Sequence, residues 1–498
     1  MNVYPRKPLF TRRPQSNIYR MFLWVILILL FVWMLQKINK GEITPLFQDT
    51  PVPTRSSTSY ALEGDANFSA GKLDAAILAY QDALRVDPNN AEIWWKLARI
   101  QTYSSEFLIT NPDKKERLLT ALESARKAVE LAPDESTAHA ILAFSLDWNA
   151  NTVIYSDDLG QVQKFLAEAE GEAVRALQLD TNNTLALAFY AEILLDQQKW
   201  DQAEENINLA LQRPDSDQMD VHRVNAYLLE TLGQYNLAIS EYDKAIALAP
   251  NFTFLYRRAG ANYRVLAFDM QNRQGEDAAK PIFEKSLEYF DKAVRINKQI
   301  NVKDPGPYLS IARTYSQMGE FFAAALNVQA ALDFDPTNPD IYGQLGIVFF
   351  RSRNYEGARD ALKCATYGCD GEASCLGRGL TGCDPENGDN PQVISGLALD
   401  PDTVVYYYTY GSVLAALSRP ADNRCDQATK VFTDIRNELT SNPDAYTDGY
   451  QIIMGIIEDG EFICSSLAAD AVPTVSVTNE AGNLAGELLM TATPAPTP

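Results

Sequence analysis

The feature that most constrains this chain is a nine-residue pattern that recurs along it. The pattern ends in Pro, has Ala five positions before that Pro and, in two of three copies, has Tyr eight positions before it. The copies are YQDALRVDP ending at Pro88, YDKAIALAP ending at Pro250 and VQAALDFDP ending at Pro336. Repetition of one pattern over hundreds of residues predicts an array of similar structural units rather than one globule.

Two further sets of positions indicate what each unit is. A small residue lies 12 positions before each Pro and a Gly lies 17 positions before it: Ala76, Ala238 and Ala324, and Gly71, Gly233 and Gly319. The pattern predicts two amphipathic helices with Gly at the turn between them, small residues where they cross, and Pro at the end of the second helix. One such hairpin cannot bury its own apolar face, so the hairpins must stack into a solenoid with a concave side.

This arrangement resembles the 34-residue tetratricopeptide repeat, W-x2-L-G-x2-Y, then A-x3-F, then P. Nine copies follow one another, and they begin at Ser57, Ala91, Ser136, Thr184, Met219, Thr253, Pro305, Pro339 and Val404. The resemblance implies an all-α, right-handed superhelical solenoid of about nine helical hairpins with a capping helix around residues 443–457. Copies two, three and six are longer than 34 residues, and we expect their extra residues to form loops between the two helices.

An apolar stretch precedes the repeats. Residues 21–35 contain no polar side chain, and residues 18–38 would span about 31 Å as a helix, close to the roughly 30 Å of a hydrocarbon core. Five Lys or Arg precede residues 21–35 and two follow them closely, a distribution that keeps the N-terminus in the cytoplasm. A cleaved signal peptide is the alternative, but no small-x-small cleavage site follows Leu35. We predict an uncleaved signal anchor in a single-pass plasma-membrane protein with an extracytoplasmic body.

The predicted segments follow in simple order. They are a cytoplasmic basic segment (1–17), the transmembrane signal anchor (18–38), a spacer (39–56), the solenoid (57–471) with a Cys-rich insertion (364–403), and a disordered tail rich in Pro, Thr and Ala (472–498).

The charge of the body limits its partners. Residues 1–40 contain seven of the 43 Lys and Arg and no Asp or Glu. The residues after them therefore contain 36 basic and 65 acidic side chains, a formal net charge of −29. A body with this charge repels phosphate backbones and anionic lipid. We therefore expect no nucleic-acid partner.

All six cysteines lie in the last third of the chain: Cys364, Cys369, Cys375, Cys383, Cys425 and Cys464. An even number in an oxidising compartment predicts up to three disulfides. Six cysteines allow fifteen pairings; we expect two bridges within residues 364–383 and a third between Cys425 and Cys464. A zinc site is the alternative, but the spacing has no CxxC and no His lies nearby.

Nothing in the sequence favours an enzyme. The chain has two histidines, His139 and His222, and both fall where the repeat places a large packed residue. HExxH, GxSxG and P-loop patterns do not occur. We expect no catalytic residue, no metal and no cofactor.

In the repeat family, the first helix of each copy lines the concave groove. At the groove positions this chain carries Trp95, Arg99, Tyr103, Phe144, Trp148, Arg223, Tyr227, Arg257, Arg264 and Arg313. Aromatic and Arg side chains dominate binding energy at interfaces. Our hypothesis is that the arginines bind an acidic or carboxylate-ended peptide and that the aromatic residues of copies two and three stack on its side chains. The alternative is that the arginines pair with Asp220, Glu230 and Glu192 and only solvate the groove.

The resulting functional prediction is a membrane-tethered extracytoplasmic scaffold or adaptor. It would mediate protein–protein interaction or complex assembly at the cell envelope by binding peptide segments in its concave groove. The second hypothesis is an envelope factor that binds polysaccharide or cell wall, because aromatic residues in a groove also stack on sugars.

Overall fold

The computed structural model describes residues 17–40, 55–108, 111–150, 154–155, 158–384, 390–446 and 449–468. The predicted tail and almost all of the basic segment and spacer lie outside these residues. The chain divides into two compact units, Met1–Ser56 and Ser57–Pro498, and each is described by itself.

The described residues of the first unit, 17–40 and 55–56, include the helix α1 (Ile18–Asn39). Its segment Ile18–Lys37 is long and apolar enough to cross a membrane, and none of it is buried within the protein. A signal sequence near the N-terminus passes the same test of length and composition.

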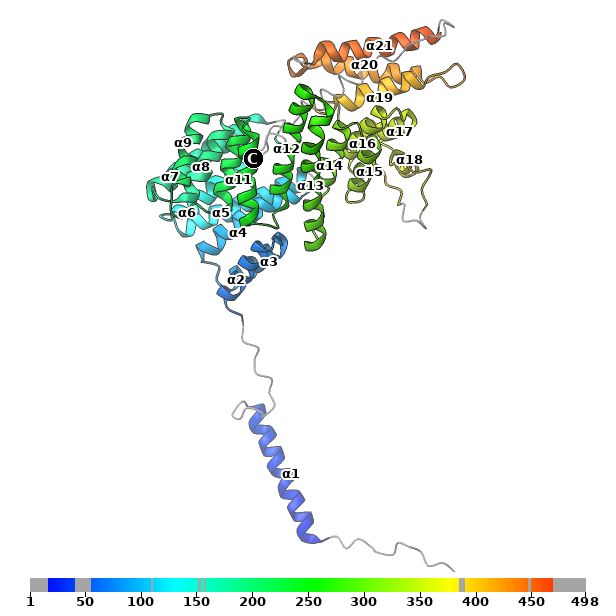
Figure 1. The fold of residues 1–498 in the computed structure, drawn as a ribbon. Coiled ribbons are helices and arrows are strands. Elements are labelled where there is room, and N and C mark those ends of the chain that lie inside the picture. Colours follow the sequence, from blue (N-terminus) through cyan, green and yellow to red (C-terminus); the bar gives the residue numbers. More distant parts are fainter. Residues whose placement is uncertain are drawn as a thin grey trace, which may run out of the picture. The chain divides into compact units, whose positions relative to one another are not determined.

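The second unit is a series of helical hairpins that follow one another in chain order (Figure 1). The hairpins are α2 (Ser57–Ser69) with α3 (Leu73–Val86), α4 (Ala91–Ser104) with α5 (Asn111–Leu131), α6 (Ser136–Asn149) with α7 (Leu159–Leu179), α8 (Thr184–Asp196) with α9 (Trp200–Leu211), α10 (Met219–Thr231) with α11 (Tyr235–Leu248), α12 (Thr253–Gln274) with α13 (Glu276–Ile300), α14 (Gly306–Gln317) with α15 (Phe321–Leu332), α16 (Pro339–Arg351) with α17 (Tyr355–Thr366), and α19 (Val404–Leu417) with α20 (Cys425–Ser441). The predicted all-α solenoid of about nine hairpins is confirmed, and the described residues contain no β-strand.

Local sequence explains why the hairpins start and turn where they do. Gly71 and Gly233 occupy the turns after α2 and α10 with φ of 70° and 72°, a region that favours glycine. Asn90 and Asn183 precede α4 and α8, and each side chain accepts a hydrogen bond from a backbone N–H of the first helical turn. Gly260 provides a close helix crossing, because a Cβ there would lie 2.6 Å from the Phe290 ring.

The extra residues of copy six do not form the loop that we expected. They lengthen both helices instead, so that α12 has 22 residues and α13 has 25, with Gly275 between them. Ala267, Ala279 and Phe283 form a small buried cluster along the added turns. The apolar period of a helix therefore continues through the insertion, which is why it packs rather than loops out. In copies two and three, α5 and α7 are likewise lengthened to 21 residues each.

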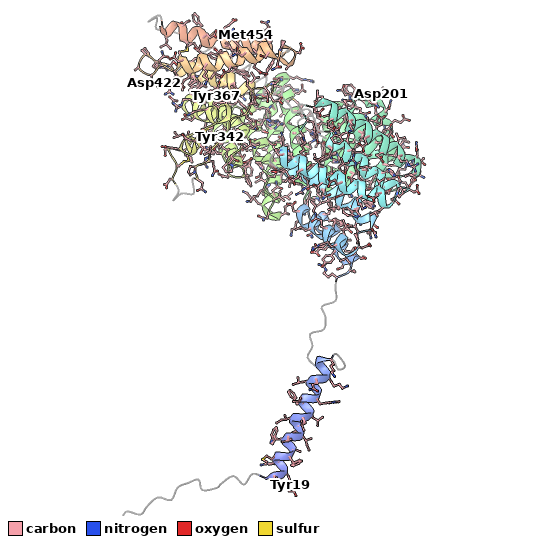
Figure 2. All side chains as sticks on the ribbon, turned by 180° about the vertical axis from the view of Figure 1, so that it is seen from behind. Tyr19, Asp201, Tyr342, Tyr367, Asp422 and Met454 are labelled. Carbon is pink, nitrogen blue, oxygen red and sulfur yellow. A yellow bond between two sulfur atoms is a disulfide. The ribbon has the colours of Figure 1, made fainter. Side chains whose placement is uncertain are left out.

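The C-terminal end of the second unit carries the disulfides and the cap. The pairs are Cys364–Cys369, Cys375–Cys383 and Cys425–Cys464, and α18 (Gly371–Gly377) lies within the Cys-rich insertion. A short 3-10 turn, Pro443–Tyr446, precedes the capping helix α21 (Tyr450–Ala468). The capping helix therefore begins and ends later in the chain than the predicted 443–457. Figure 2 marks this end of the unit with Met454 on α21, beyond Tyr342 and Tyr367 of the eighth copy.

Candidate binding surface

The first helices of successive hairpins lie side by side and form the inner wall of the solenoid. We call α2 to α11 the first half of the second unit and α12 to α21 its second half. In the first half, α4 contacts α6, α6 contacts α8, and α8 contacts α10. In the second half, α12 contacts α14, and α16 contacts α19. A partner that enters the concave side must therefore meet side chains from these helices.

Side chains from the two ends of the first half meet across this wall. The Arg99 guanidinium and the Tyr103 hydroxyl, both on α4, donate hydrogen bonds to the carboxylate of Asp220 on α10. Asp220 is wholly buried. Arg257 on α12 donates to Glu106, at an N···O distance of 2.9 Å. The second hairpin is thus joined to the fifth and sixth, and the first half closes on itself.

A buried arginine occupies the centre of this closed half. Arg223 on α10 makes a two-point ion pair with Glu192 on α8, with both N···O distances 2.5 Å. Its guanidinium lies 5.6–5.7 Å from the ring centroids of Tyr103, Phe144 and Trp148. Such a cation is stabilised by the carboxylate on its edge and by the aromatic faces around it.

This arrangement contradicts part of the predicted groove. Tyr103, Phe144 and Trp148 are 0–4% exposed and pack against one another, so they cannot stack on a ligand. Arg99 and Arg223 are held by Asp220 and Glu192. For these two arginines the structure shows the pairing with Asp220 and Glu192 that the alternative interpretation named, because closure of the solenoid brings acids from α8 and α10 to them.

Arg257 is also held within the protein. Besides pairing with Glu106, it lies over Gly306, where a Cβ would approach its guanidinium to 2.5 Å. Burial raises the pKa of nearby Asp304, and the charge of Arg257 opposes that shift. Tyr227 is 5% exposed and donates its hydroxyl to Asp196 at 2.7 Å. Neither side chain is free for a partner in this structure, whereas Trp95 is half-buried at the surface of α4.

One buried carboxyl group and one half-buried one form a feature that the sequence did not reveal. Asp147 on α6 is wholly buried, and both of its oxygens are without a hydrogen-bond partner among the described residues. Burial, reinforced by the charges of Asp196 and Glu192, raises its pKa well above the ordinary value. Burial also raises the pKa of Asp196 to about 7, although the Tyr227 hydrogen bond opposes the shift. In the sequence, the only indication of these two carboxyl groups was the presence of acidic residues at inner positions of copies three and four.

One cavity inside the closed half is too small for a peptide. A cavity of about 40 Å³ lies beside this network, and its lining consists of Glu106, Trp148, Arg223, Tyr227, Tyr242, Phe254 and Arg258. That volume accommodates a water molecule but no peptide. The described residues contain no group of three or more His, Cys, Asp or Glu arranged to hold a metal ion.

The two histidines are structural, as their repeat positions predict. His139 contacts Glu172 at 2.6 Å and the carbonyl oxygen of Pro133 at 2.9 Å. His222 contacts Glu241 at 2.7 Å. Both are less than 10% exposed, so each ties the first helix of its hairpin to the second.

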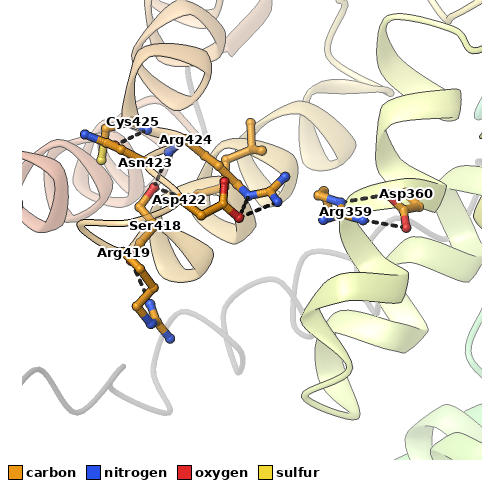
Figure 3. Close-up of polar contacts among 9 residues, drawn as sticks. Arg359, Asp360, Ser418, Arg419, Asp422, Asn423, Arg424 and Cys425 are labelled. Carbon is orange, nitrogen blue, oxygen red and sulfur yellow. Dashed lines mark hydrogen bonds and ion pairs between the residues drawn. The ribbon is translucent and has the colours of Figure 1, made fainter.

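Arginines near the C-terminal end are paired locally. Figure 3 shows Arg359 on α17, whose guanidinium donates twice to Asp360 at 2.7 and 2.8 Å. In the loop before α20, Arg424 donates to Asp422 at 2.7 Å in the same view. These two cations are neutralised by acids next to them in sequence and contribute little net attraction for an anion.

Arg264 and Arg313 differ from the arginines above. Arg264 lies on α12 and is 8% exposed, and Arg313 lies on α14 and is half-buried. Neither makes a hydrogen bond or ion pair with any residue of the ranges that the structure describes. Of the predicted groove arginines, these two are therefore the ones without a hydrogen-bond or ion-pair partner among the described residues.

The fold and this inner surface define a class, the helical-repeat solenoids that present a concave wall. Residues 64–101 match a family model described as a TPR repeat, and residues 226–252 match one described as a tetratricopeptide repeat. The chain thus contains tetratricopeptide repeats, and these repeats support a role as a scaffold for protein–protein interaction.

Several solved structures are similar to the chain. A thermophilic TPR protein of Thermus thermophilus shares 20% identity over 42% of this chain and 98% of its own, with a TM-score of 0.33. A tetratricopeptide repeat protein of Parabacteroides merdae shares 16% identity over 59% and 100%, with a TM-score of 0.30. The human IFIT1 dimer with m7Gppp-AAAA shares 15% identity over 89% and 92%, with a TM-score of 0.43.

Proposed function

We propose that this chain is a non-catalytic, membrane-tethered scaffold whose extracytoplasmic body assembles proteins at the cell envelope. The apolar helix α1 supports the tether. The excess of Lys and Arg before that helix supports a cytoplasmic N-terminus. Three disulfides support a body on the oxidising side, where such bonds persist.

The partner in this proposal binds as a peptide segment along the inner surface of α12, α14, α16 and α19. One observation carries this choice, namely the difference between the two halves of the solenoid. The inner wall of the first half is filled by the protein's own aromatic side chains and ion pairs, with Arg223 and Glu192 at its centre. On α12 and α14, by contrast, Arg264 and Arg313 have no acid partner among the described residues.

The uncompensated charge also indicates the chemistry of the segment. Two cations on the inner surface of a body with a balance of −29 attract carboxylates and repel other cations. The proposed partner segment is therefore acidic or ends in a free carboxylate.

Polysaccharide binding, the other hypothesis, loses the basis on which it was made. It rested on aromatic residues in the groove, and of those predicted there Tyr103, Phe144, Trp148 and Tyr227 are buried, which leaves only Trp95 partly exposed. We therefore do not adopt it.

Site-specific photo-crosslinking of the full chain in cells tests the proposal. Leu309 lies one helical turn before Arg313 and so shares its face of α14, whereas Leu326 lies half-exposed on the outer helix α15. A photo-crosslinking amino acid in place of Leu309 should give protease-sensitive adducts, and the same probe in place of Leu326 should not. Equal adducts from both positions, or none from Leu309, would contradict the proposal.

A further inference from the structure

A second cavity of the first half lies outside the inner wall. Its volume is about 520 Å³, within the roughly 300–1,000 Å³ that is typical of small-ligand pockets. It lies between α3 and α5, both of which pack against α4. Its exposed lining residues all belong to α3 and α5, and they are Gln81, Arg85, Thr120 and Glu123. The cavity therefore opens between the second helices of hairpins one and two, with α4 as its floor, and we call it the outer pocket.

The walls of the outer pocket are apolar. Leu84 on α3 and Leu97 on α4 line it and are 6% and 2% exposed. The half-buried indole of Trp94 also lines it, and its Nε1–H donates to the carbonyl oxygen of Pro88 at 2.8 Å. Because that hydrogen bond ties the indole to the turn before α4, the apolar wall is preformed and a ligand need not order it.

A polar group lies deep in this apolar space. Gln101 on α4 is 2% exposed and lines the pocket. Its side-chain oxygen accepts a hydrogen bond from Ser124 Oγ at 2.8 Å, whereas its side-chain nitrogen donates to no residue of the ranges that the structure describes. A buried N–H group without an acceptor costs free energy. The pocket therefore favours a ligand whose inserted end carries an oxygen.

The charges at the rim favour a neutral ligand. Arg85 forms an ion pair with Asp82, and Lys127 with Glu130 at 2.9 Å. Because both cations already have an acid, they offer little attraction to an anion. Glu123 lies on the same rim, and a cationic ligand that approached it would also meet Arg85 and Lys127.

We propose that the outer pocket binds the side chain of a tyrosine that projects from a protein partner. The phenol ring would contact Leu84, Leu97 and Trp94, and its hydroxyl would pair with the Gln101 amide. Tyrosine combines an apolar ring with a hydroxyl that both donates and accepts, and tyrosines that fill pockets are frequent anchors of protein interfaces. The site lies on the opposite set of helices from the inner surface, so it does not depend on the peptide proposed to bind there.

The test measures binding of small probes to the full chain in nanodiscs of uncharged lipid, by saturation-transfer NMR. The probes are N-acetyl-tyrosine methylamide, N-acetyl-phenylalanine methylamide and p-cresol. The tyrosine probe should bind at least tenfold more tightly than the phenylalanine probe, because only its hydroxyl satisfies the buried amide. Equal binding of these two probes, or no binding of the tyrosine probe, would overturn the proposal. Binding of p-cresol without binding of the tyrosine probe would assign the pocket to a free phenol and overturn the protein tyrosine.

A pair of variants locates the binding in the outer pocket. Thr120 is exposed on α5, so T120W should fill the mouth without disturbing the core and weaken binding of the tyrosine probe more than tenfold. The control T433W makes the same change at an exposed position of α20. Both threonine hydroxyls donate to the carbonyl oxygen four residues earlier. T433W should leave the affinity unchanged, and a T120W variant that binds like T433W would contradict the proposal.

A third variant tests the role of the Gln101 amide. Q101L leaves Ser124 Oγ with the carbonyl oxygen of Thr120 as an acceptor, at 3.1 Å. The variant should bind the phenylalanine probe as tightly as the tyrosine probe, a loss of preference that unfolding alone would not produce. A tyrosine preference that persists in Q101L would contradict the pairing of the hydroxyl with Gln101.

Discussion

Arg99 on α4 donates hydrogen bonds to the carboxylate of Asp220 on α10, which lies 121 residues later in the chain. Tyr103 donates to the same carboxylate, so one buried acid holds two side chains of the second hairpin. A solenoid is stabilised mainly by contacts between neighbouring hairpins. This contact is different, because it joins hairpins two and five and closes the inner wall between them.

Removal of Asp220 should therefore destabilise the first half strongly. D220N leaves Arg99 without its acid, and we expect a loss of about 3 kcal/mol in the free energy of unfolding, since breaking a buried ion pair costs about 3–5 kcal/mol. Denaturant unfolding of the full chain measures the change. The matched control E168Q breaks the exposed pair of Arg126 and Glu168 on α5 and α7, and should cost less than about 1 kcal/mol. Equal losses would show that the Asp220 contact does not close the wall.

The buried carboxyl group of Asp147 should make stability depend on pH. Because folding raises the pKa of Asp147 and Asp196, these two groups bind more protons in the folded state than in the unfolded state between about pH 4 and pH 7. Their contribution to stability therefore falls as pH rises through that range. D147N removes the group that has no partner. Relative to the wild type, it should be more stable at pH 8 than near pH 4, where the wild-type carboxyl group is protonated in both states.

Equilibrium unfolding at several pH values checks this difference. D201N, which changes an exposed acid on α9 (Figure 2), is the control and should leave the pH profile unchanged. A D147N variant that is less stable than the wild type at pH 8 would mean that the Asp147 carboxylate is satisfied in solution.

The Cys425–Cys464 disulfide should stabilise the C-terminal cap locally. It joins the start of α20 to α21 across 39 residues, and a loop of that length corresponds to about 2–4 kcal/mol. In the double variant C425S/C464S, amide hydrogen exchange should accelerate in α20 and α21 and stay unchanged in α6 and α8. Faster exchange throughout the chain would contradict a local role, because a solenoid transmits stability mainly between neighbours.

The proposed topology predicts which side of the membrane the body occupies. A membrane-impermeant amine reagent applied to intact cells should label lysines of the second unit, for example Lys127 and Lys244, whose side chains are half-exposed. The labelled peptides are identified by mass spectrometry, and permeabilised cells provide the reference. Labelling of these lysines only after permeabilisation would place the body in the cytoplasm and remove the basis for an extracytoplasmic partner.

The hairpins could be predicted from the sequence because their signals are local. Gly71 and Gly233 at the turns, and the small residues that precede each Pro, recur at fixed spacing, so the start of each copy was placed within one residue of the observed helix. The insertion in copy six was placed correctly, but its conformation was wrong. Its apolar residues, Ala267 and Phe283 among them, keep the period of a helix, so the sequence itself favours a helix over a loop here.

The sequence could not show which side chains of the groove are paired within the protein and which are free for a ligand. Whether Arg99 and Arg223 face a ligand or an acid depends on how tightly the solenoid curls, and no repeat encodes that curvature by itself. The acids that neutralise them, Asp220 and Glu192, are visible in the sequence, but their proximity arises from contacts between separate hairpins. The same reasoning explains why Arg264 and Arg313 could not be distinguished from the paired arginines before the fold was known.

The central claim is that partners bind the inner surface of the second half and not that of the closed first half. Photo-crosslinking from two inner positions compares them directly, with the probe in place of Leu309 on α14 or in place of Trp95 on α4, in the full chain in cells. We predict protein adducts from the Leu309 position and none from the Trp95 position. Adducts from the Trp95 position alone would show that the first half opens to receive the partner, which would contradict the account.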